Sequence, residues 1–254
     1  CQDCAITVQG CRFFENYAER DGGAVFVLYG RPQFVDTQFV LNQANRGGAL
    51  ASSDSAPVVR DCLFAVNGAL LEPLNERFGG AIYAVDDSGL TVERSTFLHN
   101  FADQGGALYI QSWSTPVRVA QSRFFGNHAQ DIGGAVLVIN SPFVMENSLV
   151  AGNRSDGNGG GIYSGFADSE FQHVTVARNT AGSNGGGLLL YSGMTMTPVV
   201  RSAILYGNSD TDLTVGSSTA DVDYSLVEGW PGGGTGNLNA YLDFEQWGSS
   251  ATST

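Results

Sequence analysis

The sequence predicts an all-β fold, a right-handed, single-stranded parallel β-helix of about eight coils with a C-terminal cap. Two observations predict it. A pattern of short apolar strands returns about every 26 residues, and the residues within each strand alternate in steps of two. No 3.6-residue period appears, which excludes leucine-rich and helical repeats. A unit of this length with two or three strands and bends is one coil, and coils stack about 4.8 Å apart.

An asparagine follows one strand of every repeat and sets the alignment. The column comprises Asn16, Asn42, Asn67, Asn100, Asn127, Asn153, Asn179 and Asn208. An apolar residue, most often Phe, precedes each Asn by three positions, and an Ala follows most of them by two. A buried amide must form hydrogen bonds, and a stacked column lets each amide bind the next. We therefore expect an asparagine ladder at one bend.

A glycine pair ends each bend before the next strand. The pairs lie at 22–23, 47–48, 79–80, 105–106, 133–134, 159–160 and 185–186. Glycine tolerates backbone torsions that side chains forbid. No pair follows Asn208, where the chain reads SDTDLTVG. We therefore assign residues 1–208 to the repeat coils and 209–254 to a terminal coil and cap, because an open solenoid end would promote aggregation.

Composition narrows the class of partner. The net charge is −13, from 25 acidic residues against 12 basic residues, all of them Arg. An acidic chain repels nucleic acid and anionic lipid, so neither is expected as a partner. No apolar run approaches the ~18 residues of a transmembrane span. A secreted or surface protein fits best, located extracellularly, in the periplasm or on the outer cell surface.

Three of the four cysteines lie close together, at Cys1, Cys4 and Cys11, and the fourth is Cys62. They allow a disulfide among the first three, with the pairing left open. If Cys1 is the mature N-terminus, it is also the residue that a lipid anchor would modify. The alternative is that the sequence begins inside a domain.

The repeated F-x-x-N…GGA-[ILV] pattern resembles the repeats of chlamydial polymorphic outer-membrane proteins and of other bacterial right-handed β-helix surface proteins. The segment YSLVEGWPGGGTGNLNA, residues 224–240, is similar to the closing segment of secreted β-helix proteins. The resemblance implies export and surface display or adhesion, often without catalysis. It specifies a fold far better than a function.

The strand after each glycine pair predicts an unusual outer surface. If Val25, Leu50 and their equivalents point inward, the alternate positions point outward. The predicted binding face comprises Phe26, Tyr83, Tyr109, Leu137, Tyr163, Leu189 and Tyr191. Such an apolar face is typical of a docking surface for a protein partner, a second copy of the chain, or a carbohydrate, with tyrosines as anchors. Two alternatives stay open: a loop or the tail covers the face, or the register is shifted by one residue and the stripe is core.

Acidic side chains lie between the Asn and the glycine pair of successive coils, at Asp103, Asp131 and Asp156. Stacked carboxylates repel one another unless they are neutralised, and Ca²⁺ with oxygen ligands would neutralise them. The offsets from the Asn vary, however, which favours solvated turn residues. No cofactor other than this calcium is expected.

Two irregular loops depart from the repeat. The insertion GALLEPLNERF follows Asn67 and carries Leu70, Leu71, Leu74 and Phe78. Long loops on a rigid scaffold often carry function, although this one would also suit a role covering the neighbouring coil. The loop QSWSTP exposes Trp113.

No catalytic set converges in the sequence. The chain has no lysine to act as a base, its arginines are scattered, and its three histidines fall in different columns. The sequence therefore favours a non-enzymatic scaffold or adhesion module. The rival hypothesis is a polysaccharide-active enzyme, a lyase or hydrolase, or a carbohydrate-binding module, which would need acids gathered along a groove.

Overall fold

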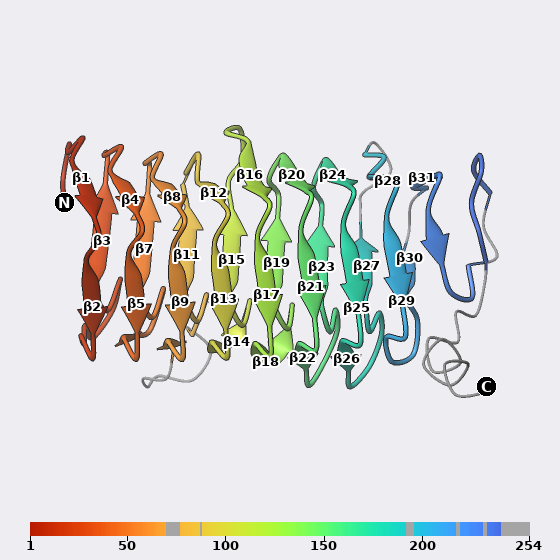
Figure 1. Ribbon diagram of the computed structural model, residues 1–254, viewed down its shortest axis with the longest axis horizontal. Coiled ribbons are helices and arrows are strands. Elements are labelled where there is room, and N and C mark those ends of the chain that lie inside the picture. Colours follow the sequence, from red (N-terminus) through yellow and green to blue (C-terminus); the bar gives the residue numbers. More distant parts are fainter. Residues whose placement is uncertain (70–76, 87, 192–195, 217–218, 231–232, 240–254) are drawn as a thin grey trace, which may run out of the picture.

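The computed structural model describes residues 1–69, 77–86, 88–191, 196–216, 219–230 and 233–239. Short strands lie side by side as rungs, and the chain advances coil by coil along one long axis (Figure 1). Every strand pair is parallel. The described residues contain no helix, and so none that could span a membrane. The predicted fold class is therefore confirmed.

Two nine-stranded sheets carry the strands that precede each ladder asparagine. Sheet B comprises β1 (Thr7–Gln9), β4 (Gln33–Val35), β8 (Val58–Arg60), β12 (Thr91–Glu93), β16 (Val117–Ala120), β20 (Phe143–Glu146), β24 (Ser169–Gln172), β28 (Val199–Arg201) and β31 (Asp221–Asp223). Sheet C comprises β2 (Arg12–Phe14), β5 (Gln38–Val40), β9 (Leu63–Ala65), β13 (Thr96–Leu98), β17 (Arg123–Phe125), β21 (Leu149–Ala151), β25 (Thr175–Ala177), β29 (Ile204–Tyr206) and β32 (Leu226–Val227).

Two further sheets flank the glycine pairs. Sheet D precedes them and comprises β6 (Gln43–Ala44), β10 (Gly68–Ala69), β14 (Phe101–Gln104), β18 (His128–Ile132), β22 (Arg154–Ser155) and β26 (Thr180–Ala181). Sheet A follows them and comprises β3 (Val25–Leu28), β7 (Leu50–Ser53), β11 (Ile82–Val85), β15 (Leu108–Gln111), β19 (Val136–Ile139), β23 (Ile162–Gly165), β27 (Leu188–Tyr191) and β30 (Leu213–Gly216).

The core is a continuous column of side chains inside the coils. On sheet C the inward phenylalanines stack face to face, with ring centroids 4.6 Å apart between Phe39 and Phe64 and between Phe97 and Phe124. These four rings are fully buried. Offset stacking adds to the hydrophobic gain from burial. Each coil therefore completes a core that it cannot build alone.

The predicted asparagine ladder is present. The Oδ1 of Asn127 accepts from both the backbone N–H and the side-chain amide of Asn100, at 3.0 and 2.9 Å. The same pair of bonds recurs from Asn16 to Asn208. At the last rung the Asp212 carboxylate replaces the next amide and accepts from the backbone and side chain of Asn208. The ladder therefore ends on a buried acid.

The two positions of each glycine pair require glycine for different physical reasons. Gly105 has φ +64, in the left-handed region, whereas a Cβ on Gly106 would overlap the carbonyl oxygen of Gly134 in the next coil. The first glycine supplies the turn, and the second allows close stacking. Sheet D has no described strand after β26, but sheets A, B and C continue through β30, β31 and β32.

Candidate functional site

The outer surface of sheet A has the predicted alternation. The register pairs Phe26 with Ala51, Ala51 with Tyr83, and Tyr83 with Tyr109, and it continues through Leu137, Tyr163 and Leu189. The residues before them, such as Ile82 and Leu108, belong to the main core. Tyr109, Leu137 and Val85 belong to a separate cluster. The column therefore faces outward, and the alternative of a one-residue shift is wrong.

Side chains from the position before each glycine pair fold over this surface. Phe78 and Ile132 pack on the outer cluster, and the Phe78 ring stacks on Tyr109 with centroids 4.9 Å apart and on Tyr83 at 6.0 Å. Sequence reasoning missed this position as a column, although it is recognisable as the residue preceding every Gly-Gly. Backbone bridges link successive members: Asp21 to Arg46, Arg46 to Phe78, Phe78 to Gln104, and Ile132 to Asn158.

The centre of the predicted face is consequently covered. Tyr109 is 7 % exposed and Leu137 0 %, and Leu189, outside the outer cluster and nearer the C-terminal end of the sheet, is 6 % exposed, so the expectation of exposure at these three positions is wrong. Burial, and then the neighbouring Tyr83, raises the pKa of Tyr109 to about 12. Phe26, at the N-terminal end of the column, is 39 % exposed, and Tyr191, two residues after Leu189 on the same strand, is 37 % exposed.

Tyr83 and Tyr163 are half-buried. The accessible surface of the face is therefore aromatic and interrupted, not a continuous apolar stripe.

A polar group borders the N-terminal part of this face. Arg46 forms a salt bridge with Asp21, Nε to Oδ1 at 2.7 Å, and its guanidinium lies over the Tyr83 ring at 5.7 Å. Phe26 and Tyr83 line a recess of about 150 Å³ together with Asp21, Arg46 and Asp86. Burial raises the pKa of Tyr83, and Arg46 opposes that rise. The recess thus offers two aromatic faces beside a cation and two carboxylates.

The acidic turn residues have separate protein partners. The carboxylate of Asp103, which is 9 % exposed, accepts hydrogen bonds from two nitrogens of Arg77, Nε to Oδ2 at 2.8 Å and Nη2 to Oδ1. Asp131 accepts from Gln104 at 3.1 Å.

Asp156 binds His128 at 3.1 Å and Arg154, and these contacts lower its pKa against the opposing effect of burial. Among the described residues, no group of three or more His, Cys, Asp or Glu side chains is arranged to hold a metal ion.

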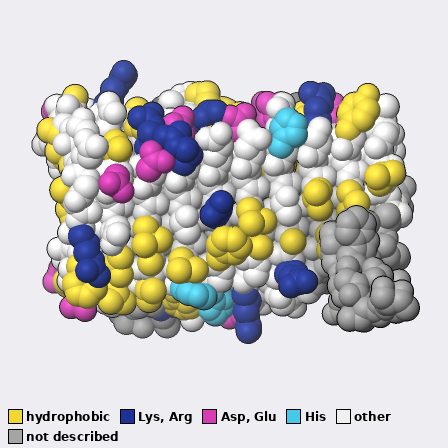
Figure 2. Space-filling view, in the orientation of Figure 1, with side chains coloured by type: hydrophobic (Ala, Val, Ile, Leu, Met, Phe, Trp, Pro, Cys, Tyr) yellow, Lys and Arg dark blue, Asp and Glu magenta, His cyan; other side chains and the backbone are white. Residues whose placement is uncertain are grey.

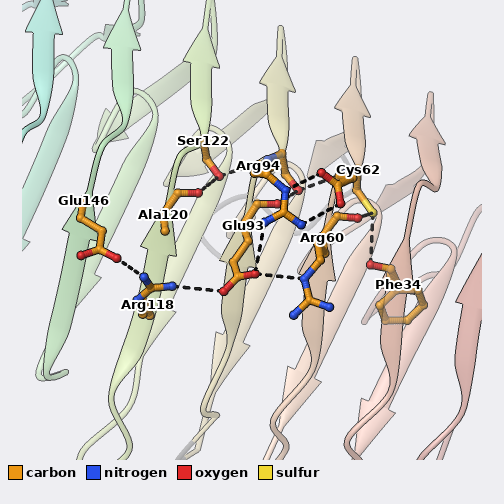
Figure 3. Close-up of polar contacts among 11 residues, drawn as sticks. Phe34, Arg60, Cys62, Glu93, Arg94, Arg118, Ala120, Ser122 and Glu146 are labelled. Carbon is orange, nitrogen blue, oxygen red and sulfur yellow. Dashed lines mark hydrogen bonds and ion pairs between the residues drawn. The ribbon is translucent and has the colours of Figure 1, made fainter.

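Sheet B carries a row of alternating charges that the sequence had suggested were scattered. Glu93 binds Arg60 at 3.0 Å and Arg118 at 3.2 Å, and Arg118 also binds Glu146 (Figure 3). At the bend beside it, Arg94 makes a two-pronged pair with Asp61, at 2.8 and 2.9 Å. Figure 2 shows such basic and acidic side chains together along the upper edge of the molecule, with hydrophobic patches below. The strand register between coils places these residues next to one another, and that register cannot be inferred from a single repeat.

The remaining sequence-predicted residues fall in three places. Phe78 lies on the outer cluster, whereas Leu70, Leu71 and Leu74 of the insertion lie outside the described residues. Trp113 is 67 % exposed. A disulfide joins Cys1 and Cys4, which decides the open pairing, while Cys11 is free and exposed and Cys62 free and buried.

Comparison with known proteins places the chain by its fold. No curated protein and no solved structure matches it. The family model described as "Right handed beta helix region" matches residues 1–164, more than half of the chain. This match agrees with the parallel coils and the asparagine ladder. The chain belongs to the right-handed β-helix family.

Proposed function

We propose that this chain is a non-enzymatic scaffold of an exported or surface-displayed protein, and that it docks a protein partner through the outer face of sheet A. The observation that carries the proposal is a second hydrophobic cluster on the outer side of sheet A, with the exposed aromatic side chains of Phe26 and Tyr191 lying beyond its two ends. Partly exposed aromatic side chains on a rigid surface are the usual anchors of protein interfaces.

The rest of the surface supports binding over catalysis. The charged side chains of sheet B form ion pairs with one another, and near sheet D Asp103 and Asp156 each pair with an arginine, while Asp131 accepts from Gln104. Paired groups of this kind are poor candidates for proton transfer, because their hydrogen-bonding positions are already occupied by protein partners. The Cys1–Cys4 disulfide supports an oxidising compartment, as expected outside the cytoplasm. The net charge of −13 disfavours nucleic acid.

The test compares variants of equally exposed apolar residues on different faces. Phe26→Ser and Tyr191→Ser alter the sheet A face, whereas Ile204→Ser removes a 43 % exposed residue from the outer side of sheet C. Labelled protein is applied to a panel of purified extracellular proteins and to itself, by biolayer interferometry and light scattering. Binding that is lost in the first two variants and kept in the third supports the proposal. Equal binding by all three, or no binding to any panel member, contradicts it.

A carbohydrate ligand is the second candidate, because the recess between Phe26 and Tyr83 combines aromatic faces with Asp21, Arg46 and Asp86. Sugar rings stack on aromatic faces and bind polar groups at their edges. An oligosaccharide array separates this candidate from protein docking. Release of reducing ends or unsaturated products from acidic polysaccharides, with and without Ca²⁺, would reveal an enzyme instead of a binding module.

A further inference from the structure

A recess at the bend between sheets A and B is bordered by two exposed aromatic rings. Trp113 lies in the loop between β15 and β16, residues 112–116, and is 67 % exposed. Phe166 lies two coils further on, at the bend between β23 and β24, and is 45 % exposed. Asn140, Ser141 and Pro142 of the intervening coil form the floor of the recess.

The recess follows from unequal bend lengths. The Trp113 bend spans residues 112–116, whereas the two following bends span only 140–142 and 166–168. Because the coils stack in register, the longer bend stands above its shorter neighbour. The hollow has a volume of about 160 Å³, the size for one side chain and not for a folded domain. Phe166 is oriented by an edge-to-face contact with Tyr191, with ring centroids 5.3 Å apart.

The lining has a single charge, and it is negative. Asp168 lies at the edge of the recess beside Phe166, is exposed, and forms no ion pair with any part of the chain that the structure describes. Pro142 and Met196 complete the apolar lining, and no arginine contributes to it. Indole and phenyl faces attract cations, the indole most strongly, and a nearby carboxylate adds to that attraction.

We propose that this recess binds one arginine or lysine side chain from a basic segment of a partner protein. The methylene stem lies against Pro142 and Met196, the cationic group contacts the faces of Trp113 and Phe166, and Asp168 pairs with its charge. The acidic chain, with 25 acids against 12 bases, favours the approach of a basic segment. The recess lies at the bend and meets the sheet A face at Tyr191, whose ring contacts Phe166, whereas Phe26 of that face lies several coils away.

Other occupants fit the lining less well. A metal ion requires several oxygen ligands, and the recess has one carboxylate. A sugar ring requires several hydrogen-bonding groups. Ser141 is buried and its hydroxyl donates to the Pro142 carbonyl at 3.3 Å, which leaves the side chains of Asn140 and Asp168 and the Trp113 indole N–H, few groups for the many hydroxyls of a sugar.

The test uses a capped peptide with two arginines and the same peptide with citrulline, the neutral isostere of arginine. Tryptophan fluorescence follows binding, and Trp113→Phe shows how much of the signal belongs to Trp113. We expect saturable binding of the arginine peptide that weakens with salt. Trp113→Ala and Asp168→Asn should each lower its affinity by about tenfold, and Trp113→Phe by less.

Matched variants separate this site from general attraction to an acidic protein. Asp54→Asn removes the same charge from an exposed position at the same bend, several coils away, and should leave affinity unchanged. Phe26→Ser should also leave it unchanged, even if it abolishes docking at sheet A. Circular dichroism and melting temperatures confirm that each variant is folded.

Four results would overturn the proposal. Two of them are equal binding of the citrulline peptide and unchanged affinity of Asp168→Asn for the arginine peptide. The third is the absence of a saturable change in fluorescence. The fourth is Trp113-dependent binding of neutral oligosaccharides with none of the arginine peptide.

Discussion

The asparagine ladder predicts a destabilisation that depends on position along the stack. Asn100 is fully buried in the middle of the ladder. Its Oδ1 accepts from the backbone N–H and the side-chain amide of Asn67, both at 3.0 Å. Its Nδ2 donates to the Phe64 carbonyl at 3.0 Å and to Asn127 at 2.9 Å. Asn100→Ala removes all four bonds while leaving the backbone bond from Asn100 to Asn127.

The magnitude follows from which groups lose their partners. The backbone N–H of Asn67 is left buried without its acceptor, which costs roughly 1–3 kcal/mol. The other three bonds contribute roughly 0.5–1.5 kcal/mol each, and part of this is recovered through the remaining partners. We expect Asn100→Ala to lower the free energy of unfolding by about 4 kcal/mol. Asn16→Ala, at a half-buried first rung, should lower it by about 1 kcal/mol, because its side chain makes one ladder bond.

Urea unfolding measures both variants, followed in parallel by circular dichroism and tryptophan fluorescence. Coincident transitions are needed before the midpoints are converted to free energies, since stacked repeats can lose cooperativity. If Asn100→Ala costs no more than Asn16→Ala, the ladder amides are not a source of stability in the interior. The reasoning would then be refuted.

Three further predictions concern charged groups. Burial, and then Glu228, raises the pKa of Asp212, so its protonated form stabilises the fold and that contribution is lost as pH rises through the folded-state pKa. Asp212→Asn, which extends the ladder as a neutral amide, should therefore raise the melting temperature at pH 7 and have little effect below about pH 4; a larger gain in acid would contradict this. Arg77→Ala should lower the free energy of unfolding by about 3–5 kcal/mol, because it removes the paired guanidinium from the buried carboxylate of Asp103. Arg94→Ala, in an exposed pair with Asp61, is the control and should have much less effect in calorimetry. Chelation with EDTA should leave the melting temperature unchanged, since Asp103, Asp131 and Asp156 have protein partners; a large drop would restore calcium as the stabilising ion.

Much of the fold was readable from the sequence because the β-helix repeats a local rule. Each Asn, glycine pair and apolar position recurs at the same place in its coil, and parallel stacking in register turns such recurrence into contact. The inward direction of Ile82 and Leu108 and the outward direction of Tyr83 and Tyr109 therefore follow from alternation alone.

The candidate site was only partly readable. Asp103 and Asp131 were recognised as acids at equivalent bends, but their partners, Arg77 and Gln104, come from neighbouring coils at other offsets. The arginines of sheet B looked scattered along the chain, although the register places Arg60 opposite Glu93. An irregular spacing between repeats hides such neighbours in one dimension and leaves them adjacent in three.

The sequence by itself determined the coil, its ladder and the direction of each side chain, because these depend on strand alternation and on hydrogen bonds between equivalent residues. Only the tertiary structure decided which outward side chains reach solvent. Phe78 and Ile132 approach from the edge of sheet D and cover Tyr109 and Leu137, while Phe26 remains exposed. Direction is a local property of a strand, whereas exposure depends on every atom that packs over the surface from elsewhere in the stack.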